Sequence, residues 1–148
     1  VEYSIFEEDS QYINNLSKKA NGLILFSGPT GSGKSTSLYK LASELASMNK
    51  QVITVEDPVE KKIPSLIQMQ VNEKAGINYD NALKSILRCD PDAMVIGEIR
   101  DYKTASQVIT SAFSGHLVLS TIHAEDSIGV INRLKDLNLS LEDIKQTL

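Results

Sequence analysis

The residues best suited to chemistry lie in a glycine-rich turn that ends in a lysine and two hydroxyls. Residues 28–36 read GPTGSGKST and match the phosphate-binding pattern G-x-x-x-x-G-K-[ST]. Glycines let the backbone fold so that several N–H groups point at one anion, and a following helix adds its positive end. Lys34 is then placed to contact the β- and γ-phosphates, and the Ser35 hydroxyl to bind Mg²⁺. The turn therefore predicts an ATP site built from Gly28, Pro29, Thr30, Gly31, Ser32, Gly33, Lys34, Ser35 and Thr36.

Carboxylates and a histidine follow three short apolar runs that read as buried strands. They are Glu56, Asp57 and Glu60 after the first run, Glu98 after the second and His123 after the third. In an open parallel sheet, ligands bind outside the carboxyl ends of the strands. Any one of these side chains taken alone is more often a solvated surface charge. Three such clusters at one sheet edge favour a site instead.

These side chains suit the chemistry of phosphoryl transfer. A carboxylate can hold Mg²⁺ or activate the attacking water. We expect Glu98 beside the phosphate-binding strand, where either role is open to it, and Glu56 could activate water. The residues alone do not divide these roles. His123 would lie near the γ-phosphate and could detect it, although an ordinary structural histidine is the commoner case.

Two arginines and the single cysteine lie near the second of these runs. Arg88 and Arg100 could act as arginine fingers across a subunit boundary, although ion pairs with nearby aspartates are the commoner fate. Those aspartates are Asp90, Asp92 and Asp101. We expect Cys89 to be a small buried hydrophobe. A single cysteine excludes a disulfide within the chain.

The elements that position these residues follow from the spacing of apolar side chains. Strands are expected over residues 23–26, 52–55, 93–96 and 117–119, with a small strand or hairpin near 67–71, where Gln68 and Gln70 alternate with apolar residues. Helices are expected over residues 11–20, 38–45, 82–87, 105–112 and 128–134, with a last one capped by Ser140. Strands that alternate with helices predict an α/β fold of three layers, with a mainly parallel central sheet.

Composition narrows the class of protein. The chain has 148 residues, 41% of them hydrophobic and 23% charged, which suits one compact domain. No apolar run approaches the roughly 20 residues that span a bilayer, and a cytosolic setting is the default expectation. The net charge of −4 and the scattered basic residues do not indicate direct nucleic-acid binding. Because the chain starts at Val1 and stops within a helix, we expect a piece of a longer protein.

Four blocks together are more specific than the phosphate turn. They are GPTGSGKST, VITVEDPVE, ILRCDPDAMVIGEIRD and GHLVLSTIHAED. Their order and spacing resemble the Walker A, Asp box, Walker B and His box of the ATPases that drive type II secretion, type IV pili and competence pili. The amino-acid sequences of several segments are most similar to those of the competence-pilus ATPases of Gram-positive bacteria.

The resemblance implies a RecA-like P-loop ATPase core over residues 1–148, without the family's N-terminal domain and C-terminal end. It implies that Glu56 activates water, with Glu60 a second possibility, that Glu98 acts on Mg²⁺ and water, and that His123 senses the γ-phosphate. It also implies hexameric rings in the cytoplasm, peripherally associated with the cytoplasmic membrane beneath an inner-membrane platform protein. The motor would then power assembly of a type IV-like pilus or pseudopilus. Without the missing parts, we expect weak hydrolysis.

Three other functions remain open from the residues. A RecA-like DNA-translocating or helicase-type motor would need a basic channel loop, which a salt-dependent DNA-binding assay would reveal. A small-molecule kinase would need a lid and an acceptor pocket, and would leave Glu98 unexplained. A nucleotide-dependent assembly module without catalysis would keep its function in a Glu98→Gln variant.

Overall fold

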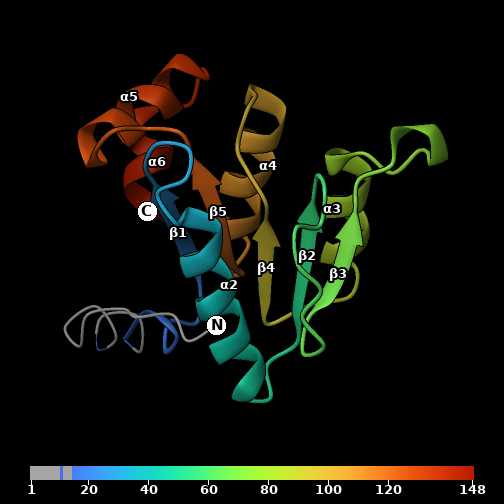
Figure 1. Ribbon diagram of the computed structural model, residues 1–148. Coiled ribbons are helices and arrows are strands. Elements are labelled where there is room, and N and C mark those ends of the chain that lie inside the picture. The colour runs from blue at the N-terminus through green and yellow to red at the C-terminus, as the bar shows by residue number, and fades with distance from the viewer. Residues whose placement is uncertain (1–10, 12–14) are drawn as a thin grey trace.

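The computed structural model describes residue 11 and residues 15–148. Within these residues the chain forms one five-stranded sheet (Figure 1). Its strands are β1 (Gly22–Ser27), β2 (Val52–Glu56), β3 (Ile67–Gln70), β4 (Ala93–Ile96) and β5 (Leu117–Ile122). The order across the sheet is β1-β5-β4-β2-β3, and every neighbouring pair is parallel. All carboxyl ends therefore meet at one edge.

Helices cover both faces of the sheet. They are α2 (Lys34–Ser47), α3 (Tyr79–Leu87), α4 (Tyr102–Phe113), α5 (Ser127–Asp136) and α6 (Leu141–Thr147), with a short 3-10 turn at Glu73–Ala75. On one face, α2 packs Leu41 and Leu45 against β4 and β5. On the other face, α3 packs against β2 and α4 packs against β1 and β5, while α5 and α6 flank the β1 side (Figure 1). The predicted three-layer α/β fold is confirmed.

The pleat of β2 divides its side chains between the two faces. Ile53 and Val55 belong to the core under α3 and α4, whereas Val52 belongs to the core under α2. Because side chains alternate along a strand, Thr54 and Glu56 lie on the same face as Val52. The strand thereby brings a carboxylate to the α2 side of the sheet, at its carboxyl end.

One expectation about strand order is wrong. Glu98 was expected beside the phosphate-binding strand, but β5 lies between β1 and β4. All six residues of β5 and all four of β4 are buried, whereas most of β1 is only half-buried, so burial accounts for the edge position of β1 but does not choose its neighbour. A strand buried on both faces suits the interior of a sheet, and the less buried strand takes the edge.

Several local predictions can also be compared with the structure. The segment near residue 67 is a parallel strand beside β2 rather than a hairpin arm. The helix predicted over residues 11–20 lies largely outside the described residues. Cys89 is exposed, not buried, because α3 ends at Leu87 before the chain can return to its apolar face. Among the helices described, none combines the length and the apolarity needed to cross a membrane.

Candidate nucleotide-binding site

The glycine-rich turn joins β1 to α2 and has the backbone that the phosphate pattern requires. Gly31 and Gly33 have φ angles of 79° and 89°, in the left-handed region that favours glycine. A Cβ on Gly28 would lie 2.6 Å from Ser32 Oγ, so the turn closes tightly at this point. The Lys34 Nζ donates to the carbonyls of Gly28 and Pro29, at 2.8 Å each. The lysine therefore folds back over the turn.

The N-terminus of α2 differs from those of the other helices described. Side chains cap α3, α4, α5 and α6, namely Asn78, Asp101, Asp126 and Ser140. The cap of α2 is Gly33, which offers no side-chain acceptor. The first N–H groups of a helix need partners from outside it, and their positive end attracts anions. This helix is therefore built to receive an anion where its neighbours receive a side chain.

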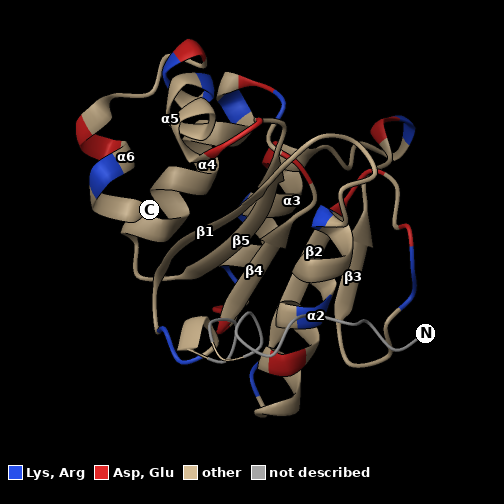
Figure 2. Cartoon of the chain, turned by 60° about the vertical axis from the view of Figure 1, so that its left-hand side comes forward, with Lys and Arg blue, Asp and Glu red and all other residues tan. Residues whose placement is uncertain are grey.

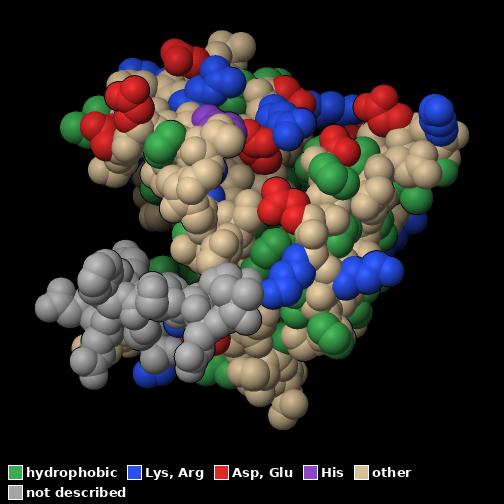
Figure 3. Space-filling model, in the orientation of Figure 1, with side chains coloured by type: hydrophobic (Ala, Val, Ile, Leu, Met, Phe, Trp, Pro, Cys, Tyr) green, Lys and Arg blue, Asp and Glu red, His purple; other side chains and the backbone are tan. Residues whose placement is uncertain are grey.

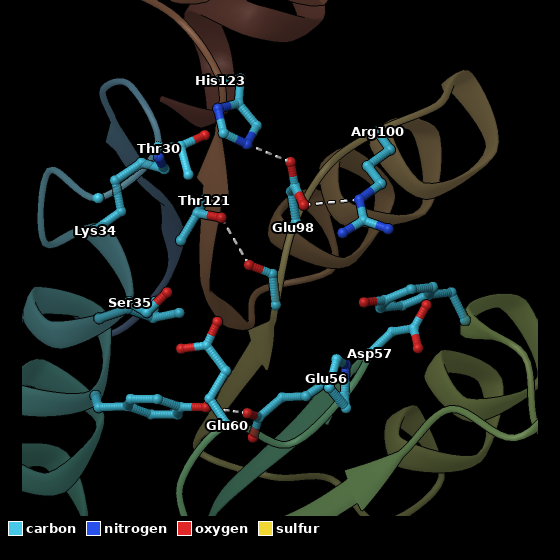
Figure 4. A pocket seen from close by; sticks show the side chains of 16 residues that line it. Thr30, Lys34, Ser35, Glu56, Asp57, Glu60, Glu98, Arg100, Thr121 and His123 are labelled. Carbon is cyan, nitrogen blue, oxygen red and sulfur yellow. Dashed lines mark hydrogen bonds and ion pairs between the residues drawn. The ribbon is translucent and has the colours of Figure 1, made fainter.

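A cavity of about 210 Å³ opens in front of this turn (Figure 4). It collects residues from the carboxyl ends of β1, β2, β4 and β5, the edge at which a parallel sheet binds ligands. Figure 3 shows acidic, basic and histidine side chains close together near these strand ends. The predicted residues that line it are Thr30, Gly31, Lys34, Ser35, Glu56, Glu60, Glu98 and His123. The remaining turn residues, Gly28, Pro29, Ser32, Gly33 and Thr36, lie outside the cavity lining.

Glu98 lies between a histidine and an arginine, each of which contacts one of its carboxylate oxygens. Its Oε1 lies 3.0 Å from His123 Nε2, and its Oε2 accepts from Arg100 Nε at 2.7 Å. Arg100 therefore pairs with Glu98 and not with any of the three aspartates considered from the sequence. Glu98 raises the pKa of the Arg100 guanidinium, which remains charged. Both oxygens of Glu98 are thus oriented at the cavity wall.

Strand β5 fixes the backbone on either side of Glu98. The Thr121 hydroxyl donates to the Gly97 carbonyl at 2.7 Å, and the Ile99 N–H donates to the Thr121 carbonyl at 2.9 Å. The dashed line from Thr121 in Figure 4 is the first of these bonds. Thr121, near the carboxyl end of β5, therefore fixes the backbone on both sides of Glu98.

Glu56 is the most enclosed carboxylate of the cavity. Its residue is only 3% exposed. Its Oε2 accepts from the Tyr39 hydroxyl, and its Oε1 accepts from Thr54 Oγ1 at 2.5 Å and Gln68 Nε2 at 3.0 Å. Burial, and then the bond to Glu56, raise the pKa of Tyr39 above its usual range.

Glu60 and Asp57 are exposed, in contrast to Glu56. Figure 4 shows the Glu60 carboxylate on the Ser35 side of the cavity, while Asp57 lies on the opposite side. Tyr79 also lines the cavity, and its burial, with Asp57 adding to the effect, raises its pKa to about 12. The tyrosine is neutral at physiological pH.

The sequence reasoning missed four residues of this site. They are Tyr39, Gln68, Tyr79 and Thr121. Helical spacing could have revealed Tyr39, because a residue four positions after Ser35 shares its helix face. The alternation of Gln68 and Gln70 with apolar residues was visible in the sequence, but it did not indicate which groups these glutamines would hydrogen-bond. Tyr79 carried no comparable signal, whereas Thr121 follows a predicted strand, where polar residues reach the sheet edge, although no role was given to it.

The residues present fit a nucleotide with Mg²⁺. The uncapped helix, the left-handed glycines and Lys34 match the needs of a polyphosphate. The Ser35 hydroxyl and nearby carboxylates are oxygen donors, which Mg²⁺ prefers. The arrangement can therefore hold a phosphate chain on one side and a metal and a water on the other.

Comparisons with known proteins show the family to which the chain belongs. The family described as type II/IV secretion system protein matches residues 1–148. Competence protein ComGA of Bacillus subtilis is 43% identical over 145 residues, which are 97% of this chain and 41% of that protein. Type II secretion system protein E of Aeromonas hydrophila is 45% identical over 127 residues, which are 86% of this chain and 25% of that protein. The chain thus spans well under half of these relatives.

Solved structures show the same fold. The pilus retraction motor PilT, solved with bound ADP, superposes with a TM-score of 0.80 and 31% identity, over 98% of this chain and 45% of that one. The ATPase DotB of Legionella pneumophila gives a TM-score of 0.74 and 28% identity, over 92% of this chain and 39% of that one. With the family match across all 148 residues, these likenesses lead to one conclusion: the chain belongs to the type II/IV secretion system protein family.

Proposed function

We propose that this protein is the ATP-hydrolysing motor subunit that powers assembly of a type IV-like pilus or pseudopilus, in type II secretion or competence DNA uptake. One observation carries the proposal: the uncapped, glycine-closed N-terminus of α2 faces Glu60, Glu98 and His123 across a single cavity. The similarity to a competence protein along nearly the whole chain favours the competence branch.

Each residue around the cavity takes a role from its position. Lys34 and the N–H groups of α2 bind the phosphates, Ser35 and Glu98 hold Mg²⁺, and His123 detects the γ-phosphate. When bound, Mg²⁺ neutralises charge on the phosphate oxygens. Among the Asp-box carboxylates, we assign the activation of water to Glu60, because Glu56 is enclosed by three donors. Glu60 is exposed to the cavity and can accept a proton from a water there.

The partners follow from the family. We propose a hexameric ring, at the cytoplasmic side of the membrane and peripherally attached, which acts on an inner-membrane platform protein. ATP is then hydrolysed where neighbouring subunits complete the site. A DNA-translocating motor is less well supported, because Figure 2 shows Lys and Arg scattered over several elements rather than gathered on one. The net charge of −4 also opposes strong binding to DNA.

Turnover of Mg-ATP, measured against protein concentration, tests the proposal. The rate per subunit should rise with concentration as a neighbour completes the site, and Glu98→Gln should abolish it. Glu142→Gln is the matched control, because Glu142 is exposed on α6, outside the cavity lining. A rate that persists in Glu98→Gln contradicts the assignment of the site. Salt-dependent binding of duplex DNA would instead support the translocating motor.

A further inference from the structure

Glu56 connects elements that come from three parts of the chain. Tyr39 reaches it from α2, Thr54 from its own strand and Gln68 from β3. Tyr39 lies one helical turn after Ser35, on the same face of α2. The carboxylate therefore ties the helix that follows the phosphate turn to two strands of the sheet.

The same network extends to the loop that carries Glu60. Gln68 Nε2 also donates to the Lys61 carbonyl at 2.9 Å, and Gln68 Oε1 accepts from the Ile63 N–H at 2.7 Å. One residue pair further along β3, Gln70 Oε1 accepts from the Val59 N–H at 3.2 Å. The two glutamines of the alternating pattern therefore fasten the backbone on both sides of Glu60.

Glu56 is badly placed to take a proton from water. Both of its oxygens already accept hydrogen bonds, two at Oε1 and one at Oε2, and the residue is 3% exposed. A general base must itself accept a hydrogen bond from the water that it activates. Glu60 meets that condition, because it is exposed in the cavity and lies on the Ser35 side (Figure 4).

We infer that Glu56 is a positioning residue: through Tyr39 and Gln68 it fixes the Glu60 loop relative to the helix that carries Ser35. This inference rests on the proposed ATPase function and adds a division of labour within the Asp box. Small misplacements of a reacting group cost large factors in rate, up to about 100-fold for an ångström. Loss of the network should therefore slow the chemical step without removing any group that contacts the nucleotide.

Tyr39→Phe is the sharpest test, because it deletes one hydroxyl that the reaction does not use. We expect single-turnover hydrolysis at saturating Mg-ATP to slow by about 5- to 50-fold, within the range for a displaced catalytic group. The dissociation constant for an ATP analogue should change by less than about 3-fold, since no phosphate contact is lost. Tyr102→Phe, on an exposed tyrosine outside the cavity, should leave both quantities unchanged.

Three further variants separate positioning from catalysis. Glu60→Gln should reduce hydrolysis by at least about 100-fold, as expected on removal of a general base. Gln68→Leu should resemble Tyr39→Phe. In a Glu56→Gln background, Tyr39→Phe should slow hydrolysis by less than about 2-fold more, because partners in one network are not additive. Rates are measured at a temperature at which thermal unfolding shows every variant to be folded, so that a purely structural loss of stability does not register.

The opposite pattern overturns the inference. If Glu56→Gln is as inactive as Glu60→Gln was expected to be, while Tyr39→Phe and Gln68→Leu retain the wild-type rate, then Glu56 activates the water. A wild-type protein that binds but does not hydrolyse ATP refutes the proposed function instead. The network is then judged by thermal unfolding: shifts in Tm from Tyr39→Phe and Glu56→Gln that simply add would refute the coupling as well.

Discussion

Replacing Gly28 with alanine should damage nucleotide binding while leaving the fold intact. The added Cβ would lie 2.6 Å from Ser32 Oγ and 3.3 Å from Ser32 Cβ. Gly28 also has a φ of 149°, which side-chain-bearing residues rarely adopt. The turn must therefore shift in the variant, and it must return to its strained form to surround the phosphates.

The size of the effect follows from that strain. A residue held in a sparsely populated backbone region costs about 1–3 kcal/mol. If binding must restore the wild-type turn, this cost appears in the affinity, and about 1.4 kcal/mol corresponds to a factor of ten. We therefore expect the dissociation constant for ATP to rise by about 5- to 150-fold, with only a small change in the free energy of unfolding.

Gly115→Ala is the matched control. Gly115 also has a left-handed φ, of 97°, but a Cβ there would meet no atom within 4 Å, and it lies between α4 and β5, outside the cavity lining. It should lower stability by about 1 kcal/mol without changing affinity, as expected for left-handed strain alone. Titration with a fluorescent ATP analogue and thermal unfolding measure the two quantities. Unchanged affinity in Gly28→Ala would refute the argument that the closed turn is the phosphate cradle.

Three other predictions follow from the site and its surroundings. Arg100→Ala should change the free energy of unfolding by less than about 1 kcal/mol, because the Arg100 side chain is 62% exposed, yet it should raise the Mg²⁺ concentration for half-maximal turnover by releasing Glu98; an unchanged Mg²⁺ dependence would show that Arg100 does not orient Glu98. The folded-state pKa of Tyr79, about 12, exceeds the unfolded value near 10, so its contribution to stability is complete below pH 10 and is lost as the pH rises toward 12. The melting temperature of Tyr79→Phe should therefore decline less steeply over that pH interval than that of the wild type. Parallel curves of melting temperature against pH would contradict the raised pKa of Tyr79. Cys89 is exposed and should react stoichiometrically with a thiol reagent in the folded protein, whereas reaction only after denaturant is added would mean that it is buried.

The fold could be predicted well where the signal is local. The phosphate turn is one contiguous segment whose glycines, lysine and serine act through their own backbone and the next helix. The buried strands are short apolar runs, and the helices show apolar residues at helical spacing. Each of these features depends on neighbours a few residues away, so the sequence displays it directly. The acidic residues at the strand ends were also visible, because a parallel sheet must deliver them to one edge.

Strand order and carboxylate environments were decided by the tertiary structure. Glu98 is separated from β1 by β5, and strand burial does not specify this order, because β4 is as fully buried as β5. Glu56 and Glu60 look alike in the sequence, yet one is enclosed and the other open. The partners that enclose Glu56 lie 17 residues before it, on α2, and 12 residues after it, on β3. Which side chains meet across such separations depends on how the helix and the strands pack. The ability of a carboxylate to accept hydrogen bonds does not by itself indicate which residues will donate them. The sequence by itself thus indicated the phosphate turn and the acids that follow the strands, and only the packing of sheet and helix decided which of these acids is enclosed and which is open to the cavity.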